Sequence, residues 1–149
     1  MDEDSRRRGE LIQVLDPKDT NVYGNIFGGV IMSMMDKAAA IVAWRYARLR
    51  VLTAGVDRIA FHSPIQVGEV VRASSTIVYV GRSSMEVEVV VSVQNLITGE
   101  DRIAASGFLT MVAVDDVWRP TEIPGWQPVA EEDVAKWREA AERRKLRGA

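Results

Sequence analysis

The sequence contains no cysteine, and His62 is its one histidine. The lack of cysteine excludes a disulfide, a thiolate nucleophile and a cysteine-ligated zinc or iron–sulfur site. With a single histidine the chain also has little to offer a histidine metal site, so we expect no metal. The longest apolar run, residues 28–44, is interrupted by Asp36 and Lys37 and falls short of a membrane span, so we expect no membrane partner.

No excess of either charge is present, because 19 Lys and Arg stand against 21 Asp and Glu, a net charge of -2. Proteins that coat nucleic acid usually carry a strongly basic face, and we therefore expect no nucleic-acid partner. The first residues, MDEDSRRRGE, contain no apolar stretch that would act as a signal peptide. We interpret residues 1–9 as a disordered polar tail and expect the protein in the cytoplasm.

What the chain does have is 47% hydrophobic residues among 149, enough for one self-supporting core. A helix is predicted from Gly29 to about Arg48. Apolar residues occupy nearly every face of this segment, and a helix of that kind belongs inside a core. They are Val30, Ile31, Met34, Met35, Ala38, Ile41, Val42 and Trp44.

Everything around this helix is predicted to be strand, because it is rich in Val, Ile and Thr. The alternation of valines with Glu86 and Glu88 indicates a sheet with one wet face. Short turns at residues 67–69, 81–83 and 98–101 predict an antiparallel meander of the later strands in chain order. The predicted strands are residues 11–15, 51–61, 70–80, 85–96 and 103–114.

The predicted fold class is therefore α+β, an antiparallel sheet wrapped around one long buried helix within a single domain at residues 10–117. Residues 118–149 form a proline-rich connector and an amphipathic C-terminal helix with a narrow apolar stripe. That stripe would pack on the same chain or on a neighbouring subunit. The free face of the sheet and its edge strands must be covered by other protein surface. A second copy of the chain is the simplest source of that surface, so we expect at least a dimer.

Asp36 does not fit its surroundings, because Met32, Met35, Ala39 and Ala40 lie about one turn away on either side. A carboxylate on so apolar a helix is costly unless it is paired or lies at a cleft. Buried acids of this kind are common at active sites, but the sequence is equally consistent with a structural role for Asp36. In the structural reading Asp36 faces a subunit seam or pairs with a cation.

Glycines at the start of the helix, in GNIFGG at residues 24–29, permit close approach to the first helical N–H groups. Such a site suits an oxyanion or a polarised carbonyl, and the alternative is a plain turn into a helix. Asp36 lies about 12 Å beyond Gly28 along the helix axis. An antiparallel helix from a two-fold partner would close that gap, which again predicts a dimer.

The stretch DTNVYGNIFGGVIMSMMD at residues 19–36 resembles the hot-dog-fold acyl-CoA thioesterases, in particular the brain-type cytosolic acyl-CoA hydrolases and their bacterial short-chain relatives. FHSPIQVGE at residues 61–69 and GRSSMEV at residues 81–87 resemble the same group, and the resemblance extends over about residues 11–115. It implies a hot-dog fold and a hydrolase of fatty acid metabolism that takes acyl-CoA. It further implies no cofactor beyond the coenzyme A of the substrate, and a homodimer built into a trimer of dimers, a hexamer.

The resemblance also implies roles for single residues. Asp36 would be the general base or the nucleophile on the thioester carbonyl. Asn21, 15 positions earlier, would work opposite Asp36 across the dimer seam. The N–H group of Gly28 would polarise the carbonyl, and the hydroxyl of Thr53 would position water.

The binding residues follow from the same resemblance. Many relatives carry histidine where Phe27 stands here, so the backbone and the helix dipole would stabilise the oxyanion unaided. The ring of Phe27 would instead line the acyl or pantetheine channel, and Gly29 would also belong to the binding residues. The turn at Arg82, Ser83 and Ser84 would lie near coenzyme A, where guanidinium and hydroxyl groups suit phosphate and Arg58 and Arg72 would add charge.

Two alternatives stay open. Asp57 and His62 have the spacing of the catalytic dyad in hot-dog enoyl-CoA hydratases, but residues five apart on a strand point to opposite faces. We therefore interpret His62 as a structural or rim residue. A non-catalytic acyl-CoA-binding or regulatory module is the second alternative, although it would have little need of both Asn21 and Asp36.

Overall fold

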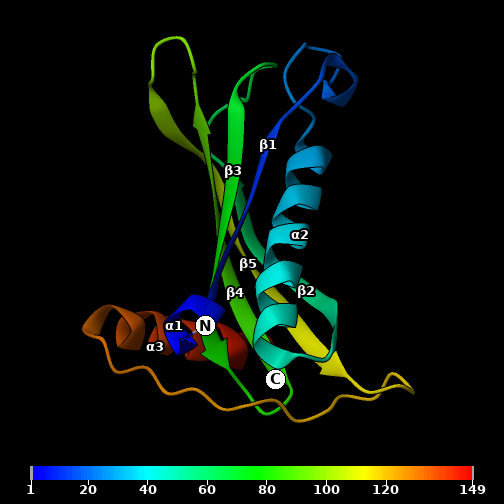
Figure 1. Cartoon of the computed structure of the whole chain (residues 1–149), viewed down its shortest axis with the longest axis vertical. Coiled ribbons are helices and arrows are strands. Elements are labelled where there is room, and N and C mark those ends of the chain that lie inside the picture. Colours follow the sequence, from blue (N-terminus) through cyan, green and yellow to red (C-terminus); the bar gives the residue numbers. More distant parts are fainter. Residues whose placement is uncertain (1, 149) are drawn as a thin grey trace.

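The computed structural model describes residues 2–148 and consists of one sheet with a helix on each face (Figure 1). Strand β1 (Arg8–Val14) precedes the long helix α2 (Gly28–Ala47), and four strands follow it. They are β2 (Arg50–Phe61), β3 (Val70–Val80), β4 (Ser84–Gln94) and β5 (Asp101–Val114). The short helices α1 (Glu3–Arg6) and η1 (Pro17–Asp19) flank β1, and helix α3 (Glu131–Leu146) ends the chain.

The sheet is antiparallel throughout and has the strand order β1-β3-β4-β5-β2. The meander of β3, β4 and β5 is as expected. The predicted pairing of β2 with β3 is wrong, because β2 pairs with β5 at the far edge of the sheet. The connection at residues 62–69 is long enough to pass over the end of two intervening strands, about 14 Å at the usual strand spacing. Both β1 and β2 are therefore edge strands.

Helix α2 lies along the concave face of the sheet, and its inner side forms the core. Ile31, Met35 and Val42 are fully buried there against the inward valines of β4. The helix begins directly after Phe27, whose backbone is extended and not helical. It ends at Arg48, which adopts a left-handed conformation with φ 56°. The predicted helix boundaries thus agree with the structure to within one residue.

Helix α3 covers part of the opposite face of the sheet. Its Trp137 ring lies 4.3 Å from the Tyr79 ring of β3, and Arg143 forms a buried ion pair of 2.7 Å with Glu86 of β4. The C-terminal helix therefore packs on its own chain. The sequence pattern predicted a wet face at the carboxylates that alternate with valines on β4, and this is wrong: the helix buries Glu86 to 3% exposure and partly covers Glu88.

The prediction of a disordered tail at residues 1–9 is wrong for the part that the structure describes. Arg7 is only 2% exposed, and its guanidinium donates to the carbonyl of Ile77 and to Asp133 of α3. It also lies 3.9 Å from the centre of the Trp126 ring. The residues that hold this segment, Ile77, Trp126 and Asp133, are far away in the sequence. The charged residues at 1–9 alone therefore could not reveal these contacts.

Candidate active site

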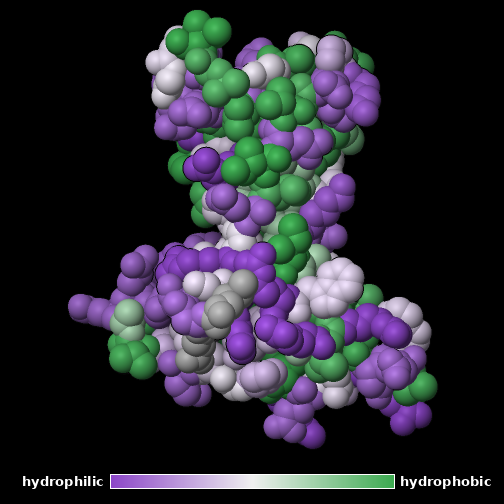
Figure 2. Space-filling model, in the orientation of Figure 1, coloured by the Kyte–Doolittle hydropathy of each residue, from purple (hydrophilic) through white to green (hydrophobic). Residues whose placement is uncertain are grey.

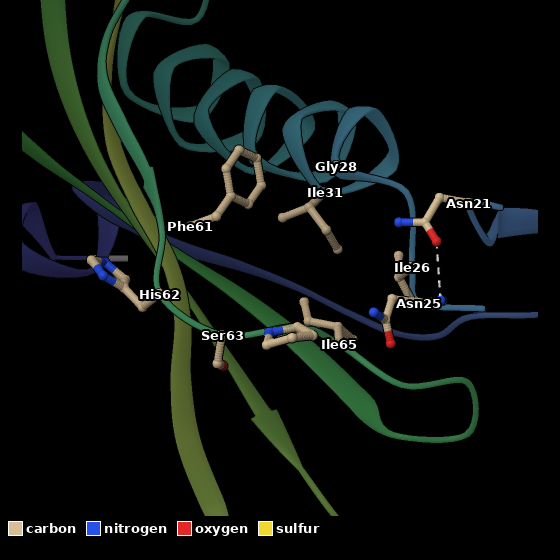
Figure 3. A pocket seen from close by; sticks show the side chains of 10 residues that line it. Asn21, Asn25, Ile26, Gly28, Ile31, Phe61, His62, Ser63 and Ile65 are labelled. Atoms are coloured by element: carbon tan, nitrogen blue, oxygen red, sulfur yellow. Dashed lines mark hydrogen bonds between the residues drawn. The ribbon is translucent and has the colours of Figure 1, made fainter. Parts of the chain in front are cut away.

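A cavity of about 400 Å³ opens beside the start of helix α2 (Figure 3). Its walls come from the loop before α2, from the first turn of α2 and from the segment after β2. The lining residues are Asn21, Asn25, Ile26, Gly28, Ile31, Phe61, His62, Ser63, Pro64 and Ile65. The cavity thus combines apolar walls with an amide side chain and a helix N-terminus, which suits a polar carbonyl on an apolar chain.

The side-chain oxygen of Asn21 is fixed by its own loop. It accepts hydrogen bonds from the backbone N–H groups of Tyr23 (2.9 Å) and Asn25 (3.2 Å), and the backbone of Asn21 donates to the Asn25 carbonyl at 2.7 Å. The side-chain NH₂ has no partner within residues 2–148 and points into the cavity in Figure 3. Asn21 therefore presents two free donors to whatever the cavity holds.

Gly28 is the first residue of α2 and lies in the cavity wall. The first N–H groups of a helix have no partners within the helix, and the positive end of the dipole lies there. A methyl group on Gly28 would lie 3.5 Å from the ring of Phe61, an ordinary van der Waals contact, so alanine would fit here but would narrow the space between this ring and the helix. The arrangement exposes backbone donors where negative charge would develop on a carbonyl oxygen.

Asp36 lies two turns further along α2, and its carboxylate accepts a hydrogen bond of 2.5 Å from the hydroxyl of Thr53. Thr53 stands just before a shift in the pairing of β2 with β5, between Thr53 and Gly55. Such irregularities in edge strands turn side chains away from the regular alternation. The sequence placed both residues in the candidate site, and the structure brings these two together.

Asp36 does not line the cavity of Asn21 and Gly28 within one chain. It lies eight positions after Gly28 on the helix, about 12 Å of rise. The gap that the sequence predicted is therefore present. The two halves of the candidate site lie on one helix but do not meet on it.

The surface around Asp36 is apolar and open. Met32 and Trp44, one turn before and two turns after Asp36, are 42% and 60% exposed. Val56 of the edge strand β2, on the same side of the strand as Thr53, is also exposed. We call Met32, Trp44 and Val56, together with Asp36 and Thr53, the open face. It holds a carboxylate within large apolar side chains, which favours cover by another protein surface.

Phe27 and Gly29 lie on the other side of the helix start and do not line this cavity within one chain. Both line a separate hollow of about 440 Å³ together with Gln13, Ser33 and Lys37. The Phe27 ring lies directly over Gly29, where an added methyl group would come within 2.5 Å of it. Successive residues of a helix are about 100° apart, so Gly28 and Gly29 cannot face the same cavity.

The predicted coenzyme A residues are also absent from this cavity. Arg82, Ser83 and Ser84 lie at the β3–β4 turn, which is the length of β3, about 35 Å, from the segment after β2. The Ser84 hydroxyl accepts a hydrogen bond from Arg144 of α3. Arg58 has a positive φ of 53° and faces Glu139 and Leu146 of α3. Within one chain these residues belong to the opposite end of the molecule or to its opposite face.

Asp57 and His62 form no dyad, but not for the predicted reason, because the pairing of β2 with β5 shifts between Asp57 and Ala60 and interrupts the regular alternation of faces. The ring of His62 lies 2.9 Å from the Ser106 hydroxyl, whereas Asp57 pairs with Arg147 at 3.4 Å. His62 stands at the rim of the cavity and turns away from its centre (Figure 3). In the described part of the chain, no three His, Cys, Asp or Glu side chains gather closely enough to hold a metal ion. Nor does any helix described there have the length and apolarity to cross a bilayer.

Comparison with known proteins decides the family. The sequence profile of the thioesterase superfamily matches residues 23–99. An acyl-CoA thioester hydrolase of Bacillus subtilis is 40% identical over 127 residues, which are 85% of this chain and 74% of that relative. The chain belongs to the thioesterase superfamily.

Solved structures agree with this assignment and confirm the predicted hot-dog fold. A hexameric acyl-CoA thioesterase matches the chain with a TM-score of 0.90 and 38% identity, over 98% of this chain and 96% of the other. An acyl-CoA hydrolase from Staphylococcus aureus, solved with butyryl coenzyme A and coenzyme A, gives a TM-score of 0.86 and 33% identity. That match covers 97% of this chain and 90% of the other.

One part of the thioesterase cavity was not predicted as functional. Ser63, Pro64 and Ile65 form a wall of the cavity, yet the sequence indicated no functional role for them. Arg102 of β5 holds this segment by donating to the Ser63 hydroxyl at 3.1 Å and to the Pro64 carbonyl at 2.6 Å. The signal was present in FHSPIQVGE, which shares the family resemblance, but its contact with Arg102 depends on the tertiary structure.

A first prediction concerns the hydrogen bond between Thr53 and Asp36 of this thioesterase. Thr53→Val keeps the shape of the side chain and removes the donor that holds the carboxylate. Hydrogen bonds to charged groups contribute about 1.5–3 kcal/mol, so we expect turnover to fall by about tenfold or more. Steady-state kinetics with an acyl-CoA substrate measures the change. Thr53→Ser, which retains the hydroxyl, is the matched control and should keep most of the activity. Equal activity of the two variants would contradict a role for this hydrogen bond.

Proposed function

We propose that this protein is an acyl-CoA thioesterase that hydrolyses acyl-CoA to a free carboxylic acid and coenzyme A. Variants of the Staphylococcus aureus hydrolase have been solved in which an asparagine, an aspartate and a threonine are replaced by alanine. In chain order those residues are 15 and 17 positions apart. Asn21, Asp36 and Thr53 have the same separations here, and the last two are hydrogen-bonded. This coincidence of spacing and contact carries the proposal.

In the proposed reaction the thioester carbonyl lies at the start of α2. The N–H group of Gly28 and the dipole of α2 stabilise the oxyanion, and the free NH₂ group of Asn21 orients the reacting groups. Asp36 takes a proton from water, which adds to the carbonyl carbon while the C–S bond breaks, and the proton passes to the leaving thiolate. In the second form of the mechanism the Asp36 carboxylate attacks the carbonyl carbon, the C–S bond breaks and coenzyme A leaves as the thiolate. Water then hydrolyses the resulting anhydride to the free acid and the Asp36 carboxylate, and its proton passes to the thiolate. Neither form needs a metal or a cofactor besides the coenzyme A of the substrate.

The proposed assembly is a two-fold dimer in which the open face of one subunit covers that of the other. Antiparallel α2 helices would bring Asp36 of one chain to the Asn21 and Gly28 cavity of its partner, and would bury Met32 and Trp44. The hexameric neighbour supports assembly of such dimers into a trimer of dimers. Phe27 and the Arg82–Ser84 turn would then act in acyl or coenzyme A binding only where subunits meet.

The activity is tested by measuring the release of free thiol from a panel of acyl-CoA thioesters of increasing chain length. We expect turnover with at least one of them, and coenzyme A and the free acid as products in equal amounts. Measurable acyl-CoA binding without turnover would favour a non-catalytic binding module. The same panel would show which acyl chain length the enzyme prefers.

That the protein is found in the cytoplasm stays a prediction.

A further inference from the structure

An ion pair between Glu69 and Arg102 lies behind the cavity wall, outside the proposed catalytic residues. The guanidinium binds both carboxylate oxygens of Glu69, at 2.5 and 2.9 Å. Glu69 is 7% exposed, and the Arg102 side chain is 32% exposed. The hydrogen bonds from Arg102 hold the pKa of the Glu69 carboxyl below its usual value, and Glu69 raises the pKa of Arg102. Both groups therefore remain charged over the physiological pH range.

The same guanidinium contacts the chain at two further points of the connection between β2 and β3. It donates to the Ser63 hydroxyl and to the Pro64 carbonyl, so four of its five N–H donors are used. Glu69 in turn accepts a hydrogen bond of 2.8 Å from the backbone N–H of Gln66. The planar guanidinium of Arg102, whose N–H donors have a fixed geometry, thus holds both ends of the segment at residues 63–69.

This segment reaches the Asn21 loop through two hydrogen bonds. The Gln66 side chain donates to the side-chain oxygen of Asn25 at 3.2 Å, and the Ile65 carbonyl accepts from the Ile26 N–H at 2.8 Å. Asn25 is the residue whose backbone groups bind both the backbone and the side-chain oxygen of Asn21. A continuous series of contacts therefore runs from β5 to the amide in the cavity, as Figure 3 shows for its last members.

We propose that Arg102 and Glu69 are positioning residues, which orient the Asn21 amide through the segment at residues 63–66 and the Asn25 loop. The inference rests on the proposed function, in which Asn21 acts on the thioester. Neither charge touches the cavity, so the pair does not act on substrate. Its effect is on the geometry of the loop, and misplacement of a reacting group by about 1 Å can lower a rate about 10²-fold.

Arg102→Lys tests the proposal, because an ammonium keeps the charge beside Glu69 but cannot also hold Ser63 and Pro64. We expect kcat to fall by about tenfold with a smaller change in KM. In an Asn21→Ala background the same substitution should lower kcat by less than about twofold, because the group that it positions is already gone. Hydrogen exchange at residues 21–27 should also become faster in Arg102→Lys.

Lys136→Met is the matched control, because it breaks the 2.6 Å ion pair of Lys136 with Glu88 on the far face of the sheet. It should leave both kcat and exchange at residues 21–27 unchanged at a comparable loss of thermal stability. Glu69→Gln, with the shape of Glu69 retained, takes the place of Arg102→Lys if that variant does not fold. An unchanged kcat in the Arg102 or Glu69 variant, or an equal fold-loss with and without Asn21, would overturn the positioning role. Full activity of Asn21→Ala alone would instead show that the proposed site is wrong.

Discussion

Asp36→Asn should lower turnover by about 10²-fold or more while the protein remains folded, since this is the usual scale for loss of a positioned general base. The substitution nearly preserves volume and keeps an oxygen that can accept from Thr53, as the carboxylate now does at 2.5 Å. What disappears is the ability to take a proton or to attack a carbonyl. The free-thiol assay measures turnover, and thermal unfolding checks the fold.

The stability of Asp36→Asn should be equal to that of the parent or higher. Asp36 is a half-buried charge in a face that also holds Met32 and Trp44, and functional sites commonly trade stability for activity. Asp57→Asn is the matched control, because Asp57 pairs with Arg147 on the other face and belongs to no proposed catalytic group. It should keep its turnover. If Asp36→Asn also kept near-normal turnover, the carboxylate would be structural.

Most of the fold could be predicted from local patterns. The all-round apolar residues of α2 located the helix, and runs rich in Val, Ile and Thr located β3, β4 and β5. Two of the errors have a common cause. Burial of Arg7 depends on Asp133 and Trp126, and the position of β2 beside β5 depends on a connection that crosses the sheet. Neither contact leaves a signal in the neighbouring residues.

The residues of the candidate site also fall into those that local sequence patterns identify and those whose position depends on the tertiary structure. Asp36 was identified because a carboxylate is costly on an apolar helix, and Gly28 because glycine permits approach to a helix start; both arguments are local. Arg82 was chosen from the family resemblance and Arg58 for its charge, and neither argument says on which face of a single chain a side chain lies. The structure places them at the far turn and beside α3. The role inferred for Arg102 follows from hydrogen bonds across 33 to 39 residues of sequence, which no motif encodes.

Mixing two inactive variants gives the second large effect that we expect. Asn21→Ala should be strongly impaired, like Asp36→Asn, and the two losses should not add, because both residues serve one transition state. If each site takes Asn21 from one subunit and Asp36 from the other, a mixed dimer has one site with both residues intact and one with neither. Random exchange of equal amounts of the two variants then restores about a quarter of all sites.

The measurement is turnover after the two variants have been unfolded and refolded together, compared with the same variants refolded apart and then combined. Only the co-refolded sample should regain activity, to about a quarter of the parent value. A mixture of Asp36→Asn with the double variant Asp36→Asn/Asn21→Ala is the control, because none of its dimers has an intact Asp36. Within a single chain Asn21 and Asp36 are separated by two turns of α2, which is why the expected recovery is large. Co-refolding that produced mixed dimers without restoring turnover would mean that each subunit holds a complete site, and the shared cavity would have to be abandoned.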